Sequence, residues 1–238
     1  MIINLISGPR NISTALMYAF AQRDDTQVVD EPFYANYLTN SKVEHPGKSD
    51  IVKSMPSEEQ DIVKSFMNLG DHHQIVFLKN MAHHQHGLDW SYMKTLKNLF
   101  LIRNPKQLIA SFAQVIPNPT MQDIGIKEEV ELFEYLTDHA FHMPIIVDSN
   151  DLLKNPKEGL EKVCSQLEIP FSQEMLNWDK GGIPEDGVWA KYWYKNVHNS
   201  TSFKKQSSSE RPLPENCRTL YEQSLPYYNK LKTHSLSI

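Results

Sequence analysis

The chain has 238 residues, of which 40% are hydrophobic and 22% charged, which suits an ordinary buried core and argues against wholesale disorder. Its net charge of −5 argues against bulk nucleic-acid binding, and no apolar stretch approaches the roughly 20 residues of a membrane helix. Cys164 and Cys217 are far apart and fit neither a disulfide framework nor a metal motif. We therefore expect a single cytoplasmic domain over residues 1–238.

Strands and helices are predicted to alternate along the chain. Five short segments are rich in Val, Ile, Leu or Phe without polar alternation, the pattern of strands buried on both faces. They are Ile2–Ile6, Gln27–Val29, Gln74–Leu78, Asn98–Ile102 and Pro144–Val147. Helical patterns cover Ser13–Gln22, Ser57–Met67, Lys106–Ala113, Lys127–Phe141 and Asn155–Leu167. This order predicts an α/β fold, a three-layer sandwich around a central, mostly parallel five-stranded sheet.

The last part of the chain follows a different pattern. Residues 178–210 carry glycines, aromatics and basic residues without a sustained period, which is typical of a lid or a binding loop. Its aromatic side chains either wall a pocket or, as we favour, pack the last helices on the sheet. These aromatics are Trp189, Tyr192, Trp193 and Tyr194. A helical pattern returns at Pro214–His234.

The first predicted strand leads into a helix through a candidate anion-binding loop. The segment reads Ser7-Gly8-Pro9-Arg10-Asn11-Ile12-Ser13-Thr14. A turn of this kind presents backbone N–H groups and the positive end of the helix, and Arg10, Ser13 and Thr14 add side-chain donors. The segment lacks the Gly-Lys-Ser/Thr of a Walker A loop. On these residues alone, a turn at Gly8-Pro9 with Ser13 as a helix cap explains the segment about as well.

A second strand end favours the anion-binding interpretation. Leu99 to Pro105 ends a strand and begins a helix, which places Arg103 at the carboxyl edge of the sheet, where open α/β folds bind ligands. Ser111 follows two turns into that helix and could lean back toward the same anion.

Together these segments resemble the P-loop sulfotransferase superfamily. Pro9 to Thr14 is similar to that family's loop for the 5′-phosphosulfate, with Arg10 in place of Lys. Arg103-Asn104-Pro105 with Ser111 matches its motif for the 3′-phosphate, and Asp151-Leu152 with Asn155-Pro156 looks like its later strand–helix segment. The resemblance implies a P-loop NTPase-like fold and 3′-phosphoadenosine 5′-phosphosulfate as the donor. It also implies donor contacts from Gly8 to Thr14.

Two features depart from the family's pattern. Asn11-Ile12 replaces a small Ser-Gly pair, so we expect the loop to hold its anion less closely. The family's C-terminal Arg-Lys-Gly segment is absent, and Lys204 and Lys205 are the nearest substitutes for contact with the 3′-phosphate.

The acceptor side needs a base. By resemblance, Glu31 falls where Arg-loop members carry one, although pairing of Asp30 or Glu31 with Arg10 explains these acids equally well. Lys79 matches the family's leaving-group lysine, while Met81 occupies the usual His position. His83 or His84 would then substitute, since a neutral His is a plausible base.

These residues predict a sulfotransferase that moves a sulfuryl group to a small hydroxyl or amine acceptor. His83, His84 and His86 lack an acidic or Cys ligand at diagnostic spacing, so we expect no metal. A P-loop hydrolase or kinase, and a nucleotide-binding domain without chemistry, remain as alternatives. Neither nucleic acid nor a membrane is an expected partner, and the oligomeric state is undetermined by the sequence.

Overall fold

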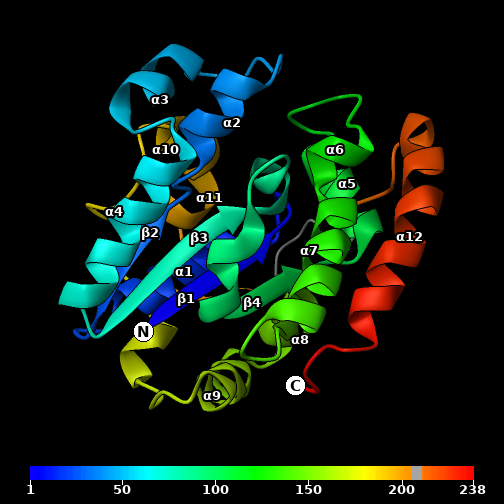
Figure 1. The fold of residues 1–238 in the computed structure, drawn as a ribbon. Coiled ribbons are helices and arrows are strands. Elements are labelled where there is room, and N and C mark those ends of the chain that lie inside the picture. Colours follow the sequence, from blue (N-terminus) through cyan, green and yellow to red (C-terminus); the bar gives the residue numbers. More distant parts are fainter. Residues whose placement is uncertain (205–210) are drawn as a thin grey trace.

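A five-stranded sheet forms the centre of the computed structural model, which describes residues 1–204 and 211–238. All its strands are parallel and run in the order β2-β3-β1-β4-β5 (Figure 1). The strands are β1 (Ile2–Ser7), β2 (Thr26–Asp30), β3 (Ile75–Met81), β4 (Lys97–Ile102) and β5 (Ile145–Asp148). The five predicted strands are confirmed, and the sheet is entirely parallel.

Five of the helices coincide with the predicted helical patterns, with ends shifted by a few residues. They are α1 (Ser13–Ala21), α4 (Glu59–His72), α5 (Pro105–Phe112), α7 (Ile126–His139) and α9 (Pro156–Leu167). Pro105 and Pro156 each stand in the first turn, where a missing N–H costs nothing, and Asn104 and Asn155 cap these helices. The start of α4 was predicted wrongly, because it begins after Glu58 rather than at Ser57.

The remaining helices are short, and most of them were not predicted. They are α2 (Tyr34–Asn40), α3 (Lys48–Ser54), α6 (Met121–Ile124), α8 (Ser149–Lys154), α10 (Ala190–Trp193), α11 (Lys195–His198) and the longer α12 (Arg218–Lys232). Within residues 1–204 and 211–238, four 3₁₀ turns accompany them: η1 (Ala82–Gln85), η2 (Trp90–Thr95), η3 (Gln173–Leu176) and η5 (Glu215–Cys217). Pro226 is accommodated inside α12.

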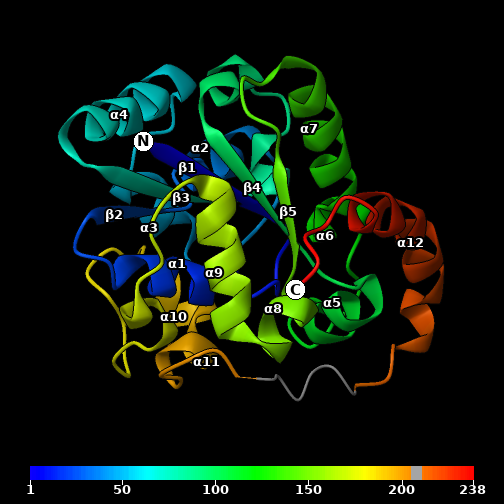
Figure 2. The ribbon, with the colours of Figure 1, turned by 90° about the horizontal axis from the view of Figure 1, so that it is seen from below.

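Two hydrophobic cores, one on each face of the sheet, make the three layers. Leu16 and Phe20 of α1 and Leu160 of α9 pack in one core with alternate strand residues. Side chains of α4, α5, α7 and α12 pack on the opposite face. Figure 2 shows α1 and α9 on one side of the sheet and α4 and α7 on the other. In Figure 1, α12 runs beside α5 and α7.

Strand β3 is longer than the predicted Gln74–Leu78, because its polar end has buried partners. Lys79 pairs in register with Leu5 of β1 on one side and with Asp30 of β2 on the other. Asn80 and Met81 continue the ladder along β1. In sequence, the polar pair Lys79-Asn80 predicts the end of a strand. In the structure, both side chains have hydrogen-bond partners on neighbouring strands.

A row of asparagines crosses the middle of the sheet on one face. Asn80 of β3 donates to Asn4 of β1 at 2.8 Å, and Asn4 donates to Asn98 of β4 at 2.9 Å. Asn98 in turn donates to the carbonyl oxygens of Met93 and Leu96. All three asparagines are fully buried. Buried amides are tolerated only when they are hydrogen-bonded, so this row fixes the register of three strands.

We expect Asn4→Leu to lower the free energy of unfolding by about 2–4 kcal/mol, because Asn80 and Asn98 each lose a partner inside the core. Urea denaturation measures this loss. Asn68→Leu makes the same chemical change on an exposed face of α4 and should stay within about 0.5 kcal/mol of the wild type. Equal stabilities of the two variants would contradict a role for the asparagine row.

Candidate functional site

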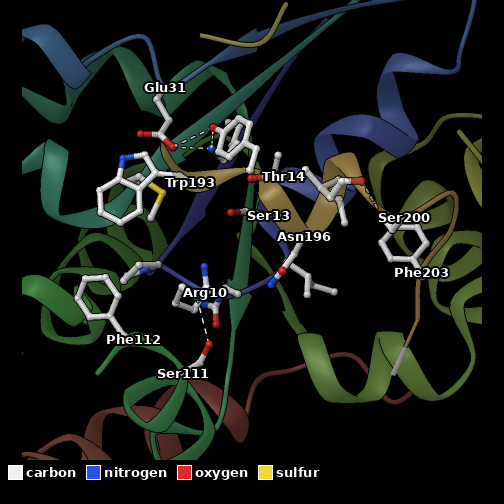
Figure 3. A pocket seen from close by; sticks show the side chains of 18 of the residues that line it. Arg10, Ser13, Thr14, Glu31, Ser111, Phe112, Trp193, Asn196, Ser200 and Phe203 are labelled. Atoms are coloured by element: carbon white, nitrogen blue, oxygen red, sulfur yellow. Dashed lines mark hydrogen bonds and ion pairs between the residues drawn. The ribbon is translucent and has the colours of Figure 1, made fainter. Parts of the chain in front are cut away.

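A pocket of about 470 Å³ opens at the carboxyl edge of the sheet (Figure 3). Its walls come mainly from the loop after β1, the ends of β2 and β3, the helix α5, and the segment 193–204 with Arg211, and Tyr34, His45 and Leu153 also line it. In Figure 3, Ser13 and Thr14 lie between Arg10 and Glu31. The carboxyl edge of a parallel sheet is where ligands bind in such folds.

The loop after β1 has an unusual backbone. Arg10 and Ile12 both have φ of 60°, in the left-handed region that a β-branched residue such as Ile12 rarely adopts. Ile12 is the residue before α1, and no side chain caps that helix. The first helical hydrogen bond runs from Leu16 N–H to the Ile12 carbonyl at 3.0 Å, so the amides of residues 13–15 precede the ladder. Ser13 is therefore not the helix cap of the alternative interpretation.

Buried hydrogen bonds hold this loop from behind. Glu129 of α7, fully buried, accepts from the Gly8 N–H at 2.6 Å. Asn11 donates to the Leu101 carbonyl at 2.5 Å, and the Ile12 side chain packs in the core beside α1. The bulk of Asn11-Ile12 is thus directed into the protein, although atoms of both residues reach the pocket wall.

Gly8 is required by a close approach. A Cβ atom at this position would lie 2.5 Å from the carbonyl oxygen of Ile124, a backbone atom that cannot move aside easily. Gly8 itself does not line the pocket, whereas Pro9 to Thr14 do. The glycine therefore brings the loop against α6, and the following residues form the wall.

Cationic side chains gather at one end of the pocket. Arg10 donates to Ser111 Oγ of α5 at 3.1 Å. Burial lowers the pKa of Arg10, and the nearby positive charge of Arg211 lowers it further. Lys204 and Arg211 also line the pocket. Lys205, predicted as a donor contact, lies outside the described residues. Several positive charges brought together at a pocket wall provide a site for an anion.

Arg103 lies behind the loop rather than on the pocket wall. Its side chain is 1% exposed and donates to the carbonyl oxygen of Arg10. Burial, with a smaller effect from the positive charge of Arg10, lowers the pKa of Arg103 to about 10. Within the described part of the chain, Ser111 lines the pocket and Arg103 does not. The structure thus brings Arg103 and Ser111 together around Arg10.

At the other end of the pocket, Lys79 is buried between two carboxylates and a phenol. Its Nζ lies 3.0 Å from Asp30 Oδ1, 2.5 Å from Glu31 Oε1 and 2.6 Å from Tyr194 Oη. Burial alone would lower the pKa of Lys79, but the charges of Asp30 and Glu31 outweigh it, so the pKa lies above its usual value. Asp30 and Glu31 therefore pair with Lys79 and not with Arg10.

The two carboxylates differ in direction. Glu31 lines the pocket and Asp30 does not. Glu31 has φ of 43°, and its N–H bonds to the Lys79 carbonyl at 2.8 Å, which turns the chain immediately after β2. Burial raises the pKa of Glu31, the charge of Lys79 opposes this, and the charge of Asp30 adds to it. A carboxylate with a raised pKa at a pocket wall is suited to general acid–base chemistry.

Histidines and aromatic rings surround Glu31. His84 stacks between Tyr34 and Tyr37, with ring centroids 4.6 Å apart in both pairs, and its Nδ1 lies 3.9 Å from Glu31 Oε2. Burial lowers the pKa of His83 to about 3 and that of His84 well below its usual value. Both imidazoles are therefore neutral at physiological pH. His83 and His84 line the pocket, whereas His86 is exposed.

The aromatics of the segment 178–204 divide between the two predicted roles. Trp193 and Tyr194 line the pocket, Trp189 is buried in the core, and Tyr192 is 43% exposed. The segment is partly ordered by short helices and folds back on α1, where Tyr18 donates to Asp186 at 2.6 Å.

Sequence reasoning missed Glu129 and Arg211, and it considered Tyr194 only as a possible pocket wall. Glu129 lies one helical turn before Phe133 on the apolar face of α7, a position where an acid is a sign of a buried partner. Asp30, Glu31 and Lys79 form an acid–lysine cluster. No local sequence pattern predicts that Tyr194 bonds to this cluster or that Arg211 approaches Arg10.

Among residues 1–204 and 211–238, no three His, Cys, Asp or Glu side chains lie together as metal ligands would. No helix in the same part of the chain has both the length and the apolar character needed to span a bilayer.

Comparison with solved structures places the fold among sulfotransferase domains. The domain from the Synechococcus PCC 7002 olefin synthase superimposes with a TM-score of 0.56 at 19% identity, covering 93% of each chain. A sulfotransferase from Alicyclobacillus acidocaldarius gives 0.53 at 10% identity, covering 98% of this chain and 96% of that one. These likenesses show the fold.

Relatives of similar sequence are longer proteins. Branched-chain-amino-acid aminotransferase-like proteins 1 and 2 of Arabidopsis thaliana are 38% and 36% identical over 234 residues. The match covers 98% of this chain and 42% of each relative, so the chain spans about two fifths of their length. The family model described as "Sulfotransferase domain" matches residues 1–235. The chain therefore belongs to the sulfotransferase domain family, as its loop and strand-end motifs predicted.

Proposed function

We propose that this chain is a sulfotransferase that uses 3′-phosphoadenosine 5′-phosphosulfate to sulfate a small hydroxyl compound. The observation that carries the proposal is one pocket with opposite chemistry at its two ends. Arg10, with Arg211 nearby, supplies positive charge at one end, and Glu31 supplies a carboxylate at the other, while Lys204 also lines the pocket. Group transfer of this kind requires an anionic donor and a base to be held on either side of the reacting atom.

The residues of the cationic end suit a donor that carries several negative charges. In this proposal, Arg10 and the amides of Ser13 and Thr14 bind the 5′-phosphosulfate, with help from both hydroxyls. Ser111, Lys204 and Arg211 take the 3′-phosphate. Arg103 supports the loop through the Arg10 carbonyl and reaches the same phosphate only if its side chain moves. The close approach of like charges supports an anionic ligand between them.

Glu31 is the better candidate for the base. Its pKa is raised by burial, whereas the pKa of His83, about 3, makes that imidazole a weak base. The acceptor O–H gives its proton to the Glu31 carboxylate as the acceptor oxygen bonds to sulfur. The bond between sulfur and the phosphate oxygen breaks, and the negative charge left on the phosphate is stabilised by Arg10 and the loop amides.

Lys79 is assigned here to the base rather than to the leaving group. An ammonium group has three N–H donors, and Lys79 has three acceptors within 3.0 Å: Asp30, Glu31 and Tyr194. This arrangement favours the ion pair over the leaving-group contact implied by family resemblance.

The surroundings of Glu31 favour a neutral hydroxyl over an amine. Glu31 already forms an ion pair with Lys79. The adjoining wall consists of neutral imidazoles and aromatic rings, including His83, His84 and Tyr34. An ammonium ion entering this end would lose its hydration without gaining a counter-charge of its own.

Donor recognition is tested by calorimetry. We expect adenosine 3′,5′-bisphosphate to bind and Mg-ATP not to compete. Arg10→Ala should weaken binding by about 10- to 100-fold, because charge-assisted hydrogen bonds to phosphate are lost. Arg218→Ala, which removes an exposed arginine on α12, serves as the matched control. A preference for Mg-ATP would instead support a hydrolase or kinase.

The support of the loop is tested at Glu129. Glu129→Gln keeps an acceptor for the Gly8 N–H, so we expect bisphosphate affinity to stay within about threefold of the wild type. Glu129→Leu should weaken binding about tenfold and speed hydrogen exchange of the Gly8 amide, while Glu131→Leu on the same helix should change neither. Unaltered Gly8 exchange in Glu129→Leu would rule out this support.

The base is tested by pH dependence in the presence of labelled donor and a panel of neutral alcohols and phenols. Glu31→Gln should lower turnover by about 100-fold or more while leaving bisphosphate affinity unchanged. In the wild type, activity should fall as the pH drops through the raised pKa of Glu31, because the protonated acid accepts no proton. A base with the low pKa of His83 would keep the rate level from about pH 5 to 8. Turnover that survives Glu31→Gln but not His83→Ala would reverse the assignment.

A further inference from the structure

Tyr194 connects the segment 193–204, which lines the pocket, to the acid–lysine cluster of Asp30, Glu31 and Lys79. It lies at the end of α10 and is buried, and its Oη is the meeting point of side chains from three segments. Lys79 Nζ donates to this oxygen at 2.6 Å and Trp189 Nε1 donates at 3.0 Å. Oη also lies 2.8 Å from both carboxylate oxygens of Asp30 and 3.3 Å from Glu31 Oε1.

These contacts determine where the phenol proton goes. A phenolic oxygen accepts through its lone pairs and has one proton to donate. Lys79 and Trp189 occupy the accepting side, because both are donors at hydrogen-bond distance. The remaining neighbours are carboxylates, so the O–H of Tyr194 points at this pair of acids, with Asp30 nearer at 2.8 Å and Glu31 Oε1 at 3.3 Å. It stabilises negative charge on this pair of acids.

Asp30 and Glu31 share these donors unequally. Asp30 accepts from Lys79, from Tyr194 and from the Gly187 N–H at 3.2 Å. Asp30 thereby anchors residues 187–194, whereas Glu31 keeps its outer oxygen toward His84 and the pocket. Two adjacent acids thus differ in role, one holding the pocket wall in place and the other facing the ligand.

We propose that Tyr194 is the positioning residue for the base, which it holds ionised and directed at the pocket from the wall that Trp193 and Tyr194 help to form. This inference rests on the proposed function, because it assigns Tyr194 a part in the action of Glu31. It goes further because it links the packing of residues 187–194 against Asp30 to the ionisation of Glu31. With Tyr194 withdrawn, Glu31 would keep Lys79 but lose a donor.

Five titratable groups face Glu31. They are Asp30 of β2, Lys79 of β3, His84 of η1, Tyr34 of α2 and Tyr194. Burial raises the pKa of Glu31, Lys79 lowers it, Asp30 raises it and the Tyr194 hydrogen bond lowers it. Loss of the phenol and loss of Asp30 should therefore move this pKa in opposite directions.

The test follows the Glu31 carboxyl carbon by NMR in protein carrying ¹³C-labelled glutamate, with its signal assigned by its absence in Glu31→Gln. Tyr194→Phe should raise the pKa of Glu31, since a hydrogen bond to the carboxylate is lost. Asp30→Asn should lower it. Tyr192→Phe makes the same change two residues away on an exposed ring and should leave the titration unmoved.

A role in packing alone would give a different result. In that case Tyr194→Phe would lower thermal stability with Glu31 titrating as in the wild type, and the proposal would be overturned. If Tyr194→Phe does not fold, 3-fluorotyrosine incorporated at Tyr194 keeps the shape and strengthens the donor. The pKa of Glu31 should then fall, and an unmoved pKa would again overturn the proposal.

Activity and binding separate this inference from the proposed function. The acid side of the pH profile of kcat/KM should move with the NMR titration, to higher pH in Tyr194→Phe. Calorimetry with adenosine 3′,5′-bisphosphate should give wild-type affinity in this variant. Failure of the wild type to bind the bisphosphate would refute the donor proposal whatever the titration of Glu31, whereas normal binding with an unmoved titration refutes the role of Tyr194 alone.

Discussion

The burial of one charged group, the Lys79 ammonium, constrains the whole edge of the sheet. A lysine with 1% of its surface exposed needs compensating charge and hydrogen bonds, because removal of an ion from water is costly. Its partners come from the end of β2 and from α10, far apart in the sequence. To satisfy Lys79, the chain must bring β2, β3 and the later segment together, and this convergence forms the carboxylate end of the pocket.

Backbone strain is concentrated around the same pocket. Within the described residues, four residues other than glycine have positive φ, and Arg10, Ile12 and Glu31 are three of them. Such conformations cost roughly 1–3 kcal/mol each and persist where the surroundings impose them. Here the surroundings are buried hydrogen bonds: Glu129 to Gly8, Asn11 to Leu101, and Glu31 to the Lys79 carbonyl. Arg10 and Glu31 line the pocket, as a preorganised site requires, while the Ile12 side chain packs in the core.

The pocket has two ends of different character. One end is cationic, and at the other end neutral side chains surround the Glu31 carboxylate. Arg10 and Arg211 approach each other, which is unfavourable without an anion between them. His83 and His84 are buried and neutral; His84 stacks with two tyrosines and His83 meets Tyr37 edge-on, so they shape the wall beside Glu31 without adding charge. The replacement of a small pair by Asn11-Ile12 is absorbed by the core behind the loop.

The sequence by itself determined the fold class, five strands, five helices and the family, because these depend on short-range patterns and on motifs with fixed spacing. It also placed Arg10, Ser111 and Glu31 near the pocket, since the ends of parallel strands meet at one edge. It misjudged the end of β3, where polar residues have partners only across the sheet. Only the tertiary structure decided that Lys79 pairs with two acids, that Glu129 supports the loop and that Tyr194 reaches Glu31. The physical reason is that buried charges find partners by proximity in space, over separations of 48 to 163 residues that no local pattern encodes.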